Sequence, residues 1–190
     1  MELEYGTATR IDEVLSLKIR QINLKANKPY ITVIGKGSKI RSAYLMSGLV
    51  TTLKKYIGTF HGEEPNPDDY LFYSSWHGEK AKLSQKAVRK RLKVYAAKAH
   101  EICLDVPLDL HSHMWRHAKA THWLEDGINI VEISKLLGHE SLETTMKYQD
   151  TEPTLKSKVC LKCLYFTIII FDLCRYLEYF SYLYTINQTE

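Results

Sequence analysis

Three short segments with helical periodicity follow one another in the second half of this 190-residue chain, and they constrain the fold more than any other feature. The first is predicted to run from about His113 to Glu125, with Ser112 as its N-terminal cap and Gly127 after its end. "NIVEISKLL" predicts a shorter helix that stops at Gly138, and "SLETTMKY" predicts a third with Ser141 as its cap. This half of the chain is therefore predicted to be mostly helical.

A longer helix is predicted ahead of these three, beginning at Ser84 in "SQKAVRKRLKVYAAKAHEI". Its apolar positions recur at helical spacing along one stripe, which consists of Val88, Leu92, Tyr95 and Ala99. A second stripe is basic and consists of Lys86, Arg89, Lys90 and Lys93. A basic helix face is most often simply solvated, but these four side chains are also candidates for contacts with nucleic-acid phosphates.

The first part of the chain contains a predicted β-hairpin, in which "YITVI" and "IRSAYL" are joined by Gly-Lys-Gly-Ser-Lys. Arg10 opens a short helical pattern, Ser47 is placed to cap another helix, and "YLFYS" is a candidate short strand. No helix is expected before Arg10. The predicted fold class is α+β, mainly helical, with a small antiparallel β-sheet near the N-terminus.

Composition sets broad limits on the kind of protein. The net charge of +4 is compatible with an acidic partner but does not demonstrate one. The four cysteines are few and irregularly spaced, which favours a reducing, cytoplasmic location over a disulfide framework. The longest apolar run, at residues 163–171, is too short to cross a bilayer, so no membrane partner is expected.

The sequence changes character after residue 158. Residues 159–190 hold five of the 13 tyrosines and three of the five phenylalanines, with no glycine or proline. We therefore expect one domain over residues 1–158, followed by an atypical apolar tail. Two hypotheses remain open for the tail: a non-native extension from a frameshift or read-through, or a helix that packs on a neighbouring subunit.

Four side chains between residues 113 and 148 suit the cleavage of a phosphodiester. His113 and Arg116 share a helix face, His139 follows Gly138 in a tight turn, and Tyr148 can act as a nucleophile. Arginine suits the non-bridging oxygens because its planar fork donates parallel hydrogen bonds and stays charged.

Each of these residues also has an ordinary structural interpretation. The histidines can be surface residues, and Arg116 can pair with Glu125 or Asp126. His113 and His117 have a spacing that can bind zinc, but no third ligand follows at an evident spacing, so no metal site is predicted.

The joint pattern resembles the catalytic domain of the tyrosine recombinase (phage integrase) family over about residues 3–152. The motifs are "HMWRH", "LLGH" and a tyrosine nine residues after the last histidine, preceded by "YGTATRIDEVLSL" and "VIGKGSKIR". Ala8 stands where the family commonly has glycine, and Trp115 where it has leucine. The family's amino-terminal core-binding domain, and the helix before the Arg10 block, are expected to be absent.

The resemblance implies a site and a mechanism. Tyr148 attacks the scissile phosphate and becomes linked to the 3′ end as a phosphotyrosine, without metal, ATP or any other cofactor. The implied supporting residues are Arg10 and Arg116 as phosphate ligands, Lys36 as general acid, His113 as general base, His139 as a hydrogen-bonding partner of the phosphate, and Glu13 as an orienting residue.

The implied partners are double-stranded DNA and further copies of the chain, because the family acts as a tetramer on DNA. Three other functions remain open at this point: a type IB topoisomerase, a DNA-binding remnant of a mobile-element integrase that does not turn over, and a metal-binding protein.

Overall fold

The computed structural model describes residues 1–76, 79–139 and 141–146, and within them the chain is mainly helical with two small antiparallel sheets. The N-terminal elements are α1 (Glu2–Thr7), α2 (Ile11–Leu15), η1 (Ile19–Gln21), β1 (Ile22–Asn23), β2 (Tyr30–Ile34), η2 (Lys36–Ser38), β3 (Ile40–Tyr44) and α3 (Ser47–His61). They are followed by β4 (Tyr73–Trp76), β5 (Glu79–Lys82), α4 (Gln85–Ile102), α5 (His113–Glu125), α6 (Ile130–Leu137) and α7 (Glu143–Met146). The predicted fold class is confirmed.

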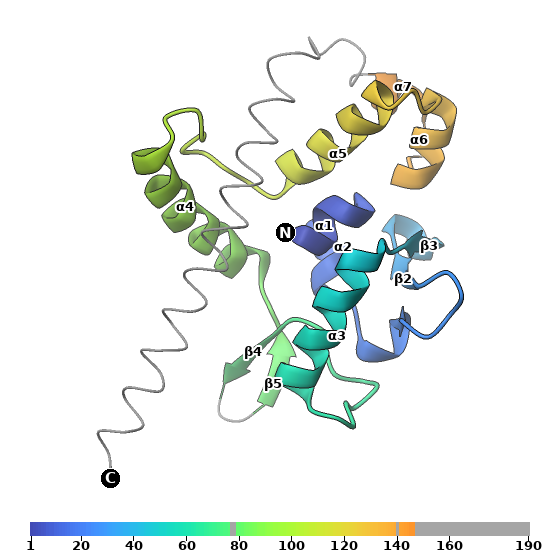
Figure 1. The fold of residues 1–190 in the computed structure, drawn as a ribbon, viewed down its shortest axis with the longest axis vertical. Helices are drawn as coiled ribbons and strands as arrows, with labels where there is room; N and C mark the ends of the chain where they lie inside the picture. The colour runs from blue at the N-terminus through green and yellow to red at the C-terminus, as the bar shows by residue number, and fades with distance from the viewer. Residues whose placement is uncertain (77–78, 140, 147–190) are drawn as a thin grey trace.

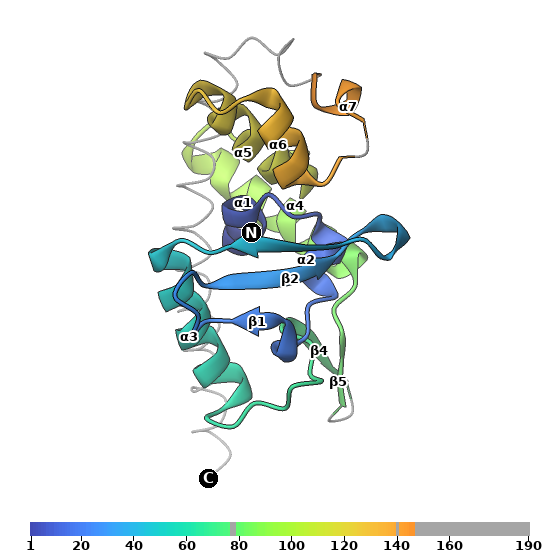
Figure 2. The same cartoon turned by 90° about the vertical axis from the view of Figure 1, so that its right-hand side faces the viewer.

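The larger sheet has the order β1-β2-β3, with α3 beside it (Figure 2). β2 and β3 form the predicted hairpin, in which Val33 lies opposite Arg41. The inner side chains of β2 are fully buried and belong to a core with α1, α2 and α3 that includes Leu3, Val14, Ile31, Val33, Leu49 and Leu53. The hairpin turn, η2, is therefore carried by a firmly anchored β-strand.

Helix α5 holds the C-terminal half together, between α4 and α6 (Figure 1). Its Trp115 packs with Leu92 and Ala96 of α4, and its Ala120 packs with Ile133 and Leu137 of α6. Ala8, which follows α1, belongs to this second cluster. The beginning of the chain is thus buried against helices more than a hundred residues away in the sequence.

The predicted helices and two of the four predicted serine caps are confirmed, and three expectations are corrected. Ser84 and Ser141 accept hydrogen bonds from the backbone N–H groups of Ala87 and Glu143, as caps do. Ser47 is not a cap, because the cap position of α3 is Met46. Ser112 occupies the cap position of α5, but its side chain makes no capping hydrogen bond.

The third correction concerns the start of the chain. A helix does precede Arg10, since residues 2–7 form α1, which packs on α3 and α5. Strand β5 was also not predicted: "EKAK" has no apolar alternation, and it forms a strand by pairing with β4.

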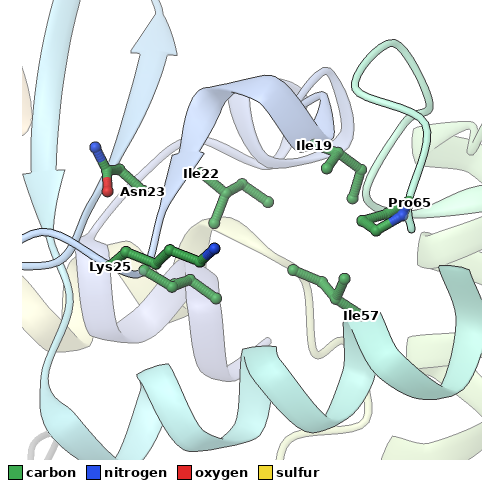
Figure 3. Close-up of a pocket in the computed structure, with 7 residues that line it drawn as sticks. Ile19, Ile22, Asn23, Lys25, Ile57 and Pro65 are labelled. Atoms are coloured by element: carbon green, nitrogen blue, oxygen red, sulfur yellow. The ribbon is translucent and has the colours of Figure 1, made fainter. Parts of the chain in front are cut away.

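An open, mainly apolar pocket of about 280 Å³ lies at the β1 edge of the larger sheet, lined by η1, β1 and the residues after it, α3 and the loop at Pro65 (Figure 3). None of the predicted site residues lines it. Within the described ranges, no helix combines the length and the apolar character that a membrane crossing requires. Tyr148, the expected domain end at 158 and the tail at 159–190 lie outside the described residues.

Candidate active site

Glu13 is a buried carboxylate shared by two arginines. The Arg10 backbone N–H donates to Glu13 Oε2 at 2.8 Å, and Arg10 Nη1 donates to Oε1 at 3.1 Å. Arg41 Nη2 donates to Oε2 at 2.9 Å. The Glu13 side chain is 5% exposed, so these bonds form largely away from solvent and hold both guanidinium groups in place.

Arg116 is buried in the first turn of α5 and is held by backbone carbonyl groups. Its Nη1 donates to Ala8 O and its Nη2 to Leu137 O, both at 2.6 Å. These carbonyls belong to the C-cap of α1 and the last residue of α6. Because helix C-termini carry partial negative charge, they stabilise the guanidinium there without neutralising it.

His139 is placed by the end of α6. Gly138 has a left-handed conformation with φ of 66°, and the His139 backbone N–H donates to Ser134 O at 3.0 Å. The imidazole ring is held by α7, where His139 Nδ1 lies 2.8 Å from the buried Thr145 Oγ1. Burial, followed by the positive charges of Arg116, Arg10 and Arg41, lowers the pKa of His139 to about 4. Its imidazole is therefore neutral at pH 7.

His113 is exposed at the start of α5. The positive charges of Arg116 and Arg10 are close enough to affect its pKa. Partial burial, His111, Arg116 and Arg10 lower the pKa of His113. Burial also lowers the pKa of His117, helped by His113 and Arg116. A neutral imidazole at this position can accept a proton, as a general base must.

The structure thus brings Arg10, Glu13, His113, Arg116 and His139 close enough together for their charges to interact. Lys36 begins η2, the turn between β2 and β3. The hairpin approaches the same region, because a Cβ atom on Gly35 would lie 3.4 Å from Glu13 Oε1. The predicted nucleophile, Tyr148, lies outside the described residues.

The four basic side chains of α4 form a separate surface. Lys86, Arg89, Lys90 and Lys93 are all exposed, and no hydrogen bond or ion pair links them to another described residue. Within residues 1–76, 79–139 and 141–146, no group of three histidine, cysteine, aspartate or glutamate residues is arranged to hold a metal ion.

The sequence motifs did not lead to Arg41 as a site residue, although the alternation of β3 indicates that it faces inward. Alternation along "IRSAYL" places Arg41 on the same face as Ala43, and that face is directed inward. A charged residue at an inward position requires a partner.

Residues 1–154 match the phage integrase family. The chain belongs to the phage integrase family. It is 41% identical over 147 residues to the tyrosine recombinase XerA of Pyrococcus furiosus, a match that covers 77% of this chain and 47% of the relative. The tyrosine recombinase XerD of Staphylococcus saprophyticus subsp. saprophyticus is 32% identical over 150 residues, covering 78% and 48%.

Solved structures of phage integrase relatives have the same fold. A crystal structure of XerA recombinase superposes with a TM-score of 0.65 at 25% identity, covering 85% of this chain and 52% of that one. The XerH site-specific recombinase bound to its palindromic difH substrate, in a post-cleavage complex, superposes with a TM-score of 0.63 at 25% identity, covering 78% and 40%. The chain spans about half the length of the curated relatives it matches.

Proposed function

We propose that this chain is the catalytic part of a site-specific DNA recombinase, which breaks and rejoins DNA through a covalent 3′-phosphotyrosine intermediate. The observation that carries the proposal is the charge arrangement around Glu13, where Arg10, Arg41, Arg116 and His139 converge although residues 10 and 139 are far apart in the sequence. This arrangement fits a phosphate group, whose charge rises in the transition state.

In the proposed reaction, the Tyr148 phenolic oxygen attacks the scissile phosphorus while His113 accepts its proton. The bond from phosphorus to the 5′ oxygen breaks, and Lys36 donates a proton to that oxygen. A 5′-hydroxyl of the partner strand then attacks the phosphotyrosine and releases Tyr148. The number of phosphoester bonds is unchanged at each step, so no ATP is required.

The residues around the phosphate have distinct roles in this proposal. Arg10 and Arg116 bind the non-bridging oxygens, and Glu13 orients Arg10. His139, neutral before DNA binds, can donate a hydrogen bond from the ring nitrogen that does not face Thr145. Lys86, Arg89, Lys90 and Lys93 contact neighbouring DNA phosphates, and strand exchange takes place in a tetramer of chains on double-stranded DNA.

A nicked suicide substrate tests this function. Cleavage close to the nick lets the short fragment that carries the free 5′-hydroxyl diffuse away. This traps the covalent adduct, which is visible as a slower band on a denaturing gel. We expect an adduct with the wild-type chain and none with Tyr148→Phe. An adduct that persists in Tyr148→Phe would refute the assigned nucleophile, and an exchange assay with two labelled sites separates a recombinase from a topoisomerase.

A further inference from the structure

Side chains in β3 alternate between exposed and inward-facing positions, and Arg41 occupies an inward-facing one. It lies opposite Val33, which is fully buried, while the adjacent Ile40 and Ser42 are exposed. Its own side chain is 18% exposed. Burying a guanidinium group costs free energy unless an opposite charge lies nearby and its N–H groups donate hydrogen bonds to acceptors.

The partners of Arg41 come from two other parts of the site. Its Nη2 donates to Glu13 Oε2 at 2.9 Å, and its Nε points to Leu136 O at a longer distance of 3.4 Å. Glu13 belongs to the block that carries Arg10, and Leu136 lies three residues before His139. One side chain therefore connects the hairpin, α2 and the end of α6.

Two glycines pack closely against the Arg41–Glu13 pair. A Cβ atom on Gly138 would lie 3.3 Å from both Cδ and Nε of Arg41, and Gly138 also has a positive φ. A Cβ atom on Gly35 would lie 3.4 Å from Glu13 Oε1. Close packing therefore surrounds the Arg41–Glu13 pair from the hairpin turn to the His139 turn.

We propose that Arg41 is a positioning residue that clamps the hairpin carrying Lys36 to Glu13 and to the turn carrying His139. Its value to catalysis rests on the proposed function, in which Lys36 protonates the leaving oxygen. The hairpin turn is closed locally by a hydrogen bond from Gly35 N to Lys39 O at 2.8 Å. That bond fixes the shape of the turn, whereas the clamp fixes where the turn lies relative to the phosphate.

Hydrogen exchange tests the clamp without any reaction. Arg41→Met should accelerate amide exchange in the peptides covering residues 30–44 and 134–139, with little change in residues 49–57 of α3. Arg20→Met is the matched control, because Arg20 also pairs with a carboxylate, Asp68, but on the exposed surface. Equal exchange in the Arg41→Met and Arg20→Met variants would overturn the proposal.

Arg41→Lys is a second variant for the case in which Arg41→Met accelerates exchange throughout the protein. A lysine retains the charge beside Glu13 but lacks the planar fork that also reaches Leu136. We expect peptide 30–44 to behave almost as in the wild type and peptide 134–139 to exchange faster. No acceleration at 134–139 would show that Arg41 does not hold the His139 turn.

A sulfur-substituted substrate tests whether the clamp acts through Lys36. With sulfur in place of the bridging 5′ oxygen, the leaving group is a thiolate, which needs little help from an acid since a thiol has a pKa of about 8.5. Arg41→Met should slow cleavage of ordinary DNA by about 10²-fold and slow cleavage of the sulfur substrate much less. Equal losses on both substrates would refute action through the hairpin. If the wild-type chain forms no adduct at all, the proposed function fails, and hydrogen exchange still decides whether the clamp exists.

Discussion

Two groups of basic side chains in this molecule are built in opposite ways. Arg10, Arg41 and Arg116 are held by a buried carboxylate or by helix-terminal carbonyls, while the basic side chains of α4 stand free in solvent on an exposed helix face. A fixed charge loses little freedom when a phosphate binds, so it can stabilise a particular transition state. A solvated charge attracts DNA in general but holds no single atom in place. We therefore propose that the first group takes part in the chemistry and that the second contributes to DNA affinity.

The largest effect is expected for Arg116→Lys. A lysine cannot bridge the carbonyls of Ala8 and Leu137, so the charge loses its fixed position. Adduct formation on the suicide substrate should slow by about 10²–10³-fold. Arg91→Lys, on the exposed face of α4, is the control and should leave the rate unchanged. Similar rates for the two variants would remove the distinction between fixed and solvated charges.

Glu13→Gln comes next, with its neighbour Asp12→Asn as the control. Removing the buried anion leaves Arg10 and Arg41 facing each other without compensation, which should cost about 3 kcal/mol of unfolding free energy. Asp12 is largely exposed, although it pairs with Lys82, so its loss should cost under about 1 kcal/mol. Urea unfolding followed by circular dichroism measures both variants, and equal losses would contradict the assigned roles.

Glu4 sharpens the comparison, because its buried carboxyl group lacks hydrogen bonds to described residues of the kind that Glu13 accepts. Neither carboxylate oxygen has a hydrogen-bond partner among the described residues, and burial raises the pKa of Glu4 to about 8. The folded state therefore retains a proton that the unfolded state loses, and stability contributed by neutral Glu4 should decline as the pH rises from about 4.5 to about 8.

Glu4→Gln should remove this decline and stabilise the chain at pH 8 by roughly 1–3 kcal/mol. The difference between wild type and variant is the useful quantity, since His139 titrates with the opposite slope. Its lowered pKa makes the folded state gain stability as the pH rises from about 4 to 6.5. Melting temperatures at pH 5 and pH 8 measure the difference, and parallel curves for the two proteins would contradict the assignment.

The smallest effect per residue is expected on α4. Changing Lys86, Arg89, Lys90 and Lys93 to glutamine should flatten the dependence of log K on log salt by about 0.9 for each DNA phosphate that the variant no longer neutralises, with little change in cleavage rate at saturating DNA. The control changes four exposed lysines elsewhere to glutamine, with the same reduction in charge: Lys25, Lys28, Lys54 and Lys55. Equal slopes for the two quadruple variants would remove α4 from the DNA interface.

Local periodicity was sufficient to predict the hairpin and the helices α3 to α7, because their apolar stripes and glycine stops lie within a few residues of each other. It failed where an element forms through contacts with other elements and has little periodicity of its own. β5 forms because β4 lies beside it, and α1 forms because the cores of α3 and α5 cover residues that have little helical signal of their own.

The candidate site shows the same division. Arg10, Glu13, Arg116 and His139 could be named from motif spacing and family resemblance. The carbonyl groups that hold Arg116 could not be predicted, since they come from the ends of two other helices. For Arg41 the sequence indicated only an inward-facing position in β3. Its pairing with Glu13 could be seen only in the structure.

The central claim is that Arg116 binds a non-bridging oxygen of the scissile phosphate, and a neutral substrate tests it most directly. Replacing one non-bridging oxygen by a methyl group removes the negative charge that the guanidinium meets. We predict that Arg116→Ala slows cleavage of ordinary DNA far more than cleavage of the methylphosphonate substrate in one of its two stereoisomers. Equal losses on ordinary DNA and on both stereoisomers would contradict the account.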